Sequence, residues 1–347
     1  MKSLIRKKIK GFKDKITSKA VILMYHRVAE IDYDPWSLAV SPKYFEEQLI
    51  VLKKRNLGIS LNKMVERHQQ NKLGSGSLAL TFDDGYGDNY RNAKPLLGKY
   101  DIPATFFIAT AYLDQKKEFW WDELENILFA TPILPDKLQV NAMGKDYLWD
   151  LANEDPLSNT YQEELKSWRV EAAFRNARQK AFLDLWTIIK PLSPNQQENI
   201  MGQLRKYTRQ KPREINFPLT SKQLLDIAEN NLFCLGAHTC YHRSLPALSA
   251  ENQSAEISGS IRALENLLGR QITAFAFPYG DYSDETTSLL KEQHISVACT
   301  TEFRAVNTTE NLLSLPRFQV MDWSGEEFDY QLNKWFNHLK LNNYFGK

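Results

Sequence analysis

Short apolar runs alternate with amphipathic stretches along most of the chain after residue 19. Seven runs are almost wholly apolar and have the length of buried strands, and helix-like stretches with apolar positions three and four residues apart separate them. This alternation is typical of an α/β protein with a parallel sheet buried on both faces, and seven strands favour a barrel over an open doubly wound sheet. The expected strands cover 21–26, 77–82, 104–109, 233–238, 273–278, 295–300 and 317–321, and the expected helices cover 41–56, 88–100, 220–230, 250–268 and 284–293.

The alternation stops between residues 113 and 216. This segment is rich in Trp, Leu, Glu, Lys and Gln, is mostly helical in pattern, and is far too long for a loop between a strand and a helix. We therefore expect one barrel domain over residues 20–347, interrupted by a largely helical insertion that covers one side of the site.

The first nineteen residues differ from the rest of the chain. They carry eight lysines and arginines against one acid, and we call this segment the basic lead. Because the net charge of the whole chain is only +2, the residues after 19 are together acidic. Ile5, Ile9, Phe12 and Ile16 recur at helical spacing, which gives the lead an apolar face suited to peripheral contact with an anionic membrane. A solvated tail, or a helix packed on the body, is the alternative. The acidic remainder argues against a nucleic-acid partner.

Composition places the chain among soluble globular proteins. Its 347 residues are 43% hydrophobic and 25% charged, a length within the range of one α/β barrel. Three cysteines, an odd number without CxxC spacing, are typical of free thiols in a reducing compartment. Neither a signal peptide nor an apolar stretch long enough to span a membrane is evident, so we expect a cytoplasmic protein, peripheral at the inner membrane face.

Two adjacent aspartates end the second apolar run, in "TFDDG". The carboxyl ends of barrel strands carry the chemistry, and Gly85 permits the chain to leave β geometry so that Asp83 and Asp84 serve one site. One carboxylate would then bind a cation while the other acts as a base. The alternative is an ordinary turn in which Asp88 and Asn89 cap the next helix.

Two histidines four residues apart follow another apolar run, in "GAHTCYH". In a first helical turn, His238 and His242 would share one face, with Cys240 pointing away from them and so not a ligand. Two imidazoles and a carboxylate leave open positions on a metal, which is typical of catalytic zinc. The same set suits non-haem iron oxygenases, but those usually hold their ligands on antiparallel β scaffolds.

Two further strand ends carry candidate groups. In "FPYG", Pro278 and Gly280 force a turn whose backbone N–H groups, Tyr279 first among them, are suited to meet a developing oxyanion. In "LMYHRV", His26 is either a buried, hydrogen-bonded histidine or a general acid.

Taken in order, TFDDG, HTxxH and FPYG resemble the polysaccharide deacetylases, the NodB-homology group known as carbohydrate esterase family four. The resemblance covers about residues 20–112 and 217–325, and YHRV near the start is similar to the circularly permuted branch of the PgaB and IcaB type. It implies a distorted (β/α)7 barrel that removes N-acetyl groups from an N-acetylhexosamine-containing polysaccharide or glycan precursor. It also implies one divalent metal, with Zn²⁺ expected and Co²⁺, Ni²⁺ or Mn²⁺ as alternatives.

The resemblance also assigns roles to residues of this chain. It implies that Asp83 is the general base, that Asp84, His238 and His242 bind the metal, and that the Tyr279 N–H, in the turn with Pro278, supports the oxyanion. His26 would be the acid that protonates the leaving amine.

The chain departs from the better-known branch of that family. It lacks the third-motif arginine that tethers the base and the C-terminal leucine-x-histidine, two absences that are shared by the permuted branch. Arg317 is expected either to orient Asp83 or to form a surface salt bridge, and "FWWDE" at 119–123 either stacks on sugar rings or packs in a core. An O-acetyl esterase, a small-amide hydrolase and a non-catalytic glycan-binding relative remain the alternative functions.

Overall fold

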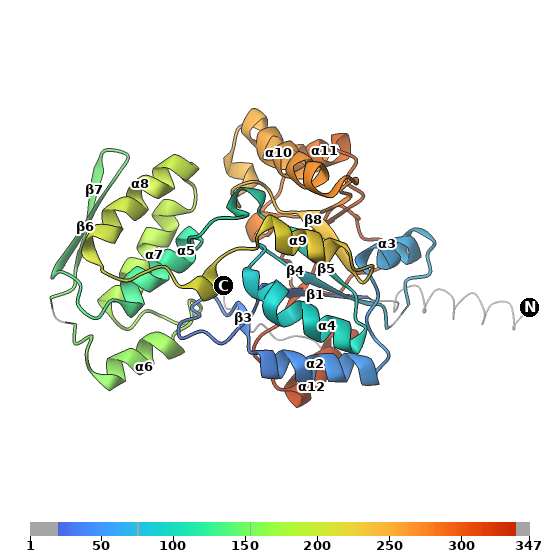
Figure 1. The fold of residues 1–347 in the computed structure, drawn as a ribbon, viewed down its shortest axis with the longest axis horizontal. Helices are drawn as coiled ribbons and strands as arrows, with labels where there is room; N and C mark the ends of the chain where they lie inside the picture. Colours follow the sequence, from blue (N-terminus) through green and yellow to red (C-terminus); the bar gives the residue numbers. More distant parts are fainter. Residues whose placement is uncertain (1–19, 75, 153, 338–347) are drawn as a thin grey trace, which may run out of the picture.

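The computed structural model describes residues 20–74, 76–152 and 154–337 (Figure 1). The predicted amphipathic lead at 1–19 lies outside the described residues, so its membrane contact stays a prediction. No helix in the described part of the chain is both long and apolar enough to cross a bilayer.

Seven parallel strands form the central sheet, and each lies within one of the seven predicted runs, shortened at its ends. Their apolar side chains are buried almost without exception because helices cover the outside while the sheet curls around its own interior. The order across the sheet is β10-β9-β8-β5-β4-β1-β11. The strands are β1 (Val21–Tyr25), β4 (Leu78–Phe82), β5 (Ala104–Ile108), β8 (Phe233–Ala237), β9 (Ala274–Ala276), β10 (Val297–Cys299) and β11 (Phe318–Gln319).

The two edges of this sheet meet through an irregular segment rather than a regular ladder. Cys299 at the end of β10 forms an isolated parallel bridge with Leu315, shortly before β11. The Thr300 N–H donates to the Leu315 carbonyl at 2.8 Å, and the Arg317 N–H donates to the Glu302 carbonyl at 3.0 Å. The predicted class, a distorted (β/α)7 barrel, is therefore confirmed, and the distortion lies between β10 and β11.

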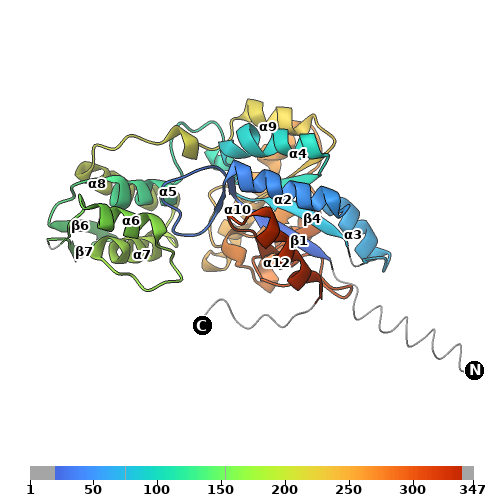
Figure 2. The same cartoon turned by 90° about the horizontal axis from the view of Figure 1, so that it is seen from below.

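Helices pack around the outside of the sheet (Figure 2). All five predicted helices are present, and Thr220 caps one of them by accepting from the Gln223 N–H at 3.2 Å. Two amphipathic helices, α3 and α12, were not predicted. The helices are α2 (Pro42–Lys54), α3 (Leu61–Gln69), α4 (Lys94–Tyr100, after a π turn at Asn89–Ala93), α9 (Ser221–Ala228), α10 (Ala250–Leu268), α11 (Asp284–Glu292) and α12 (Gly325–Asn337).

The insertion forms a separate lobe beside the barrel, at the left of Figure 1. It has its own aromatic-rich core, to which the barrel adds a few side chains such as Tyr33 and Tyr86. It is mostly helical, as predicted, but it also holds an antiparallel hairpin whose first strand alternates exposed and buried residues. Its elements are α5 (Trp120–Glu125), a π turn (Asn126–Ala130), β6 (Lys137–Ala142), β7 (Lys145–Asp150), α6 (Asn159–Ser167), α7 (Ala177–Ile189) and α8 (Pro194–Leu204).

Short elements shape the loops at the barrel mouth. The strands β2 (Arg27–Val28) and β3 (Ala39–Val40) pair with each other just after β1. Single 3-10 turns occur at Thr110–Tyr112, Arg205–Tyr207, Glu214–Asn216, Leu245–Ala247 and Pro278–Gly280.

Candidate active site

The aspartate pair leaves strand geometry immediately after β4. Asp84 has φ 71° and Gly85 has φ 87°, both in the left-handed region that is rare for residues with side chains. The Asp84 carbonyl accepts from the Ala109 N–H at 3.2 Å and the Asp83 N–H donates to the Tyr25 carbonyl at 3.0 Å, which ties the turn to both neighbouring strands. This turn brings both carboxylates to the mouth of the barrel, where regular strand geometry would have separated them.

The histidine pair lies on a loop, so the predicted helical turn is wrong. Thr239 and His242 have φ 62° and 54°, and the intervening Cys240 and Tyr241 N–H groups donate to one Glu256 carboxylate oxygen on α10 at 3.0 and 2.9 Å. Anchoring these two N–H groups to Glu256 replaces the intrahelical hydrogen bonds that a helix would have used. Cys240 thereby faces α10 and takes no part in the site, as expected.

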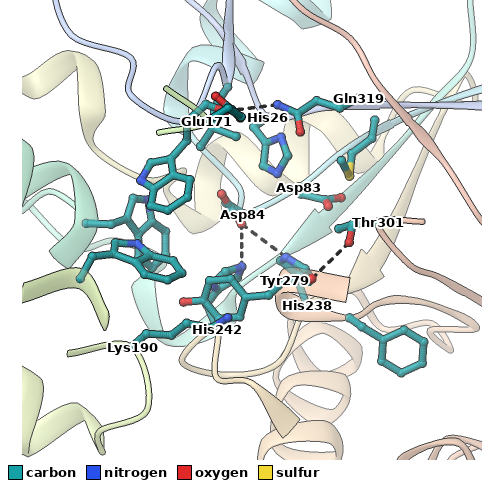
Figure 3. A pocket seen from close by; sticks show the side chains of 16 residues that line it. His26, Asp83, Asp84, Glu171, Lys190, His238, His242, Tyr279, Thr301 and Gln319 are labelled. Carbon is teal, nitrogen blue, oxygen red and sulfur yellow. Dashed lines mark hydrogen bonds and ion pairs between the residues drawn. The ribbon is translucent and has the colours of Figure 1, made fainter. Parts of the chain in front are cut away.

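His238, His242 and Asp84 nevertheless converge. The Nε2 atoms of His238 and His242 lie 3.4 and 3.2 Å from Asp84 Oδ1, and all three side chains are buried (Figure 3). One ligand atom from each residue lies within 4.8 Å of the others.

The protonation of this group fits a bound cation. His238 Nδ1 lies 2.7 Å from the Ala276 carbonyl, which only accepts, so Nδ1 carries the proton and the Nε2 lone pair faces Asp84. Asp84 Oδ1 is buried without a hydrogen-bond donor. Burial alone would raise the pKa of Asp84, but the neighbouring imidazoles in their protonated form outweigh it and hold this pKa well below its usual range; a cation bound at the Nε2 atoms would replace those protons. Three converging lone-pair donors are the set that a divalent transition metal prefers.

Asp83 is held by Arg317 inside the barrel. Arg317 Nη1 and Nη2 donate to the two Asp83 oxygens at 2.7 Å each, while Nε donates to the Thr300 carbonyl at 2.8 Å and Nη1 also to Thr81 Oγ1 at 3.0 Å. Both ion-pair side chains are at most 3% exposed, so the alternative of a surface salt bridge is wrong. Burial alone would raise the pKa of Asp83, but the Arg317 guanidinium outweighs it and lowers this pKa.

His26 follows β1 and lines the same pocket as the two aspartates (Figure 3). Its carbonyl accepts from Asn89 Nδ2 at 2.9 Å, and Asn89 in turn donates to Asp88 at 3.0 Å. Asp88 accepts from Arg27 Nε and from the Val28 N–H at 3.0 Å each, and its side chain caps no helix. The helix-cap alternative for this segment is therefore wrong, and these two residues instead fix the strand end that carries His26.

The FPYG motif forms the expected turn beside the histidines. Tyr279 has φ 60°, and its ring lies edge-on to His242 with 4.6 Å between centroids. A Cβ on Gly280 would approach Thr301 Oγ1 to 2.1 Å, so this position admits only glycine. Pro278 opens the turn and is buried.

These groups share one pocket of about 320 Å³. All the predicted catalytic and metal-binding residues line it. The two predicted supporting residues, Arg317 and Pro278, are buried behind it. The catalytic roles themselves stay predictions. Of the FWWDE segment, Trp121 lines the pocket, 4.9 Å from the His242 ring, while Trp120 packs in the insertion. Sequence reasoning missed the remaining lining residues, because their strand, helix or loop patterns are those of ordinary surface and core positions. They include Trp36, Glu171, Trp186 and Lys190.

Comparison with known proteins supports the same fold. The profile of the Polysaccharide deacetylase family matches residues 70–141 and 198–298, on both sides of most of the insertion. The poly-β-1,6-N-acetyl-D-glucosamine N-deacetylase of Staphylococcus aureus is 30% identical over 146 residues, which cover 38% of this chain and 47% of the relative. The chain thus spans about half the length, or less, of the curated relatives it matches.

Two solved structures share the fold over nearly the whole chain. The Streptococcus pyogenes deacetylase PplD, solved with acetate, is 20% identical, with a TM-score of 0.56 over 90% of this chain and 98% of that chain. IcaB from Ammonifex degensii is 18% identical, with a TM-score of 0.56 over 91% of this chain and 97% of that chain.

Proposed function

Because the chain carries a polysaccharide deacetylase domain of the NodB-homology type, we propose that it is a metal-dependent hydrolase acting on N-acetylated glycans. The reaction would remove N-acetyl groups from an N-acetylhexosamine-containing polysaccharide or glycan precursor. The observation that carries the proposal is the convergence of Asp84, His238 and His242 beside the buried Asp83–Arg317 pair in one pocket. The name of the S. aureus relative supports an N-acetylglucosamine polymer as the substrate class.

Asp84, His238 and His242 would hold the divalent cation, for which we propose Zn²⁺ because two imidazoles and one carboxylate match its preferred ligands. When bound, such a cation lowers the pKa of water and polarises a carbonyl oxygen. Asp83 is suited to take the proton of the attacking water, since Arg317 keeps its carboxylate ionised and donates only one hydrogen bond to each of its oxygens. Each ion-paired oxygen retains a further lone pair to accept that proton.

Amide hydrolysis also needs a proton for the leaving nitrogen. A C–O bond forms between water and the acetyl carbon, the C–N bond breaks, and the products are acetate and the free amine of the sugar. His26 is suited to donate that proton, because it lines the pocket and its Nδ1 makes no hydrogen bond in the described part of the structure. The Tyr279 N–H, on the left-handed turn beside His242, is suited to stabilise the oxyanion.

The experiment that tests this proposal compares amide and ester substrates under one set of conditions. Purified protein is incubated with N-acetylglucosamine oligosaccharides and, separately, with O-acetylated xylan, and released acetate and free amines are measured. We expect acetate and free amine in equal amounts from the first substrate and a much slower release from the second. Preferential release from the xylan would instead establish an O-acetyl esterase, and no release from either would support a glycan-binding relative.

The basic lead supports a proposal about location. Eight positive charges in residues 1–19 are suited to an anionic inner membrane face, where lipid-linked or nucleotide-linked sugar precursors are at hand. We propose that the chain acts in the cytoplasm and in peripheral contact with that membrane.

A further inference from the structure

The insertion is fastened to two separate loops at the barrel mouth. One of them follows β2, where the Val170 N–H donates to the Pro35 carbonyl at 2.9 Å and the rings of Trp36 and Trp186 lie 4.6 Å apart. Tyr33, on the same loop, donates its hydroxyl to Gln162 Oε1 at 3.0 Å. These contacts bind the insertion to the β1 side of the mouth.

The second loop follows β9, which is four strands away from β1 in the sheet order. There the Trp186 ring lies at 5.9 Å from the Tyr279 ring, at 88° to it. Lys190, directly after α7, lies with Nζ 3.8 Å above the Tyr279 ring and 3.5 Å from Asp281 Oδ2. Trp186 therefore contacts both loops, and the insertion bridges the mouth from one side to the other.

This bridge continues as an aromatic wall down to the metal-binding group. The chain of ring contacts runs from Trp36 through Trp186 and Tyr279 to His242, and the Trp121 ring also lies 4.9 Å from the His242 ring. Figure 3 shows aromatic rings on one side of Asp84 and the labelled Thr301 and Gln319, both from the barrel, on the other.

A wall on one side constrains how a glycan enters. An internal sugar of a polymer needs space for the chain on both sides of the reacting residue, whereas a terminal sugar needs it on one side. The pocket volume of about 320 Å³ is also near the lower end of the roughly 300–1,000 Å³ found for small-ligand sites. Resting on the proposed deacetylase function, we propose that the site accepts the N-acetylhexosamine at the end of a glycan chain, or in a short precursor, and excludes internal residues. Trp186 is the specificity-determining residue of this wall.

The test uses an N-acetylglucosamine oligosaccharide of defined length, isotopically labelled at its reducing end. It is incubated with the full-length, metal-loaded protein until release stops, and the positions of the free amines are mapped by tandem mass spectrometry. We expect one acetyl group lost per chain, always from the same terminal residue. Free amines on internal residues, formed at comparable rates, would overturn the inference while leaving the deacetylase function intact. If no acetyl group is released from any oligosaccharide, the proposed function fails and this inference fails with it.

Matched variants link the selectivity to the wall. Trp186→Ala removes the ring that joins the two loops, and Trp186→Phe keeps an aromatic ring at the same place. We expect Trp186→Ala to raise the ratio of internal to terminal deacetylation about tenfold or more, and Trp186→Phe to change it far less. Thermal unfolding and metal content identify a variant that has lost its fold. In that case Lys190→Ala, which removes the contacts of the insertion with Asp281 and the Tyr279 ring, is measured instead. Unchanged selectivity in a folded Trp186→Ala or Lys190→Ala variant would overturn the role of the wall.

Discussion

Replacing Arg317 by methionine leaves the Asp83 carboxylate buried without its cation. The pair is at most 3% exposed and is joined by two hydrogen bonds of 2.7 Å, and the substitution also removes the donors to Thr300 and Thr81. Breaking a buried pair by removing one partner costs about 3–5 kcal/mol, because the remaining charge is desolvated and unpaired. An exposed pair would cost only about 0–1 kcal/mol, so the size of the effect separates the two cases.

The assay is equilibrium unfolding by denaturant of four proteins: wild type, Arg317→Met, Asp83→Asn and the double variant. All are measured with excess chelator, because metal bound next to Asp83 would otherwise add its own stabilisation. We expect Arg317→Met to lower the free energy of unfolding by about 3–5 kcal/mol, and Asp83→Asn to restore part of that loss in the double variant. A loss below about 1 kcal/mol with no coupling between the two positions would refute the reasoning.

The pH dependence of the same variants has a definite sign. Arg317 lowers the pKa of Asp83 below the usual value of about 3.9, so the pair stabilises the folded state fully above about pH 4 and less as the pH falls below it. The difference in stability between wild type and Arg317→Met should therefore shrink in acid. A difference that stays constant from neutral pH into strong acid would contradict this assignment.

Three further predictions concern other groups. His26→Ala should lower kcat by about 10²–10⁴-fold with little change in KM, and an unchanged kcat in steady-state kinetics would exclude His26 as the acid. Burial raises the pKa of Asp122, on α5, to about 7. The free energy of unfolding should therefore fall as the pH rises from about 4 to 7, because the unfolded chain loses this proton first. Asp122→Asn should flatten that decline in unfolding measurements, and an unaltered slope would show that other groups cause it. Deleting residues 1–19 should abolish salt-sensitive sedimentation with anionic vesicles, and equal sedimentation of both forms would contradict the membrane proposal.

The sequence predicts the barrel well because its strands are local and strongly patterned. The seven apolar runs are buried on both faces almost without exception, which leaves a continuous signal that needs no knowledge of distant partners. The hairpin in the insertion was missed, although 137–142 alternates with period two, because its neighbours are helical in pattern. Helices α3 and α12 were missed although both are amphipathic and as long as helices that were predicted.

The site was predictable in its residues but not in its backbone. The motifs placed His238 and His242 together, yet the loop between them is set by Glu256 on α10, a partner that no local pattern reveals. The burial of Arg317 depends on the fold of strands β4 and β10 around it, so sequence could not separate a buried partner of Asp83 from a surface pair. The wall around Trp186 likewise depends on how the insertion docks.

The most direct test of the central claim is the appearance of free amines on an N-acetylglucosamine oligosaccharide, measured with and without metal. We expect wild-type protein to release acetate and amine in equal amounts, to lose this activity after chelation, and to regain it when Zn²⁺ is restored. Asp84→Asn, chosen because asparagine tolerates the left-handed backbone at φ 71°, should bind little metal and should not recover. Amine release that survives complete removal of the metal, or that persists in Asp84→Asn, would contradict the account.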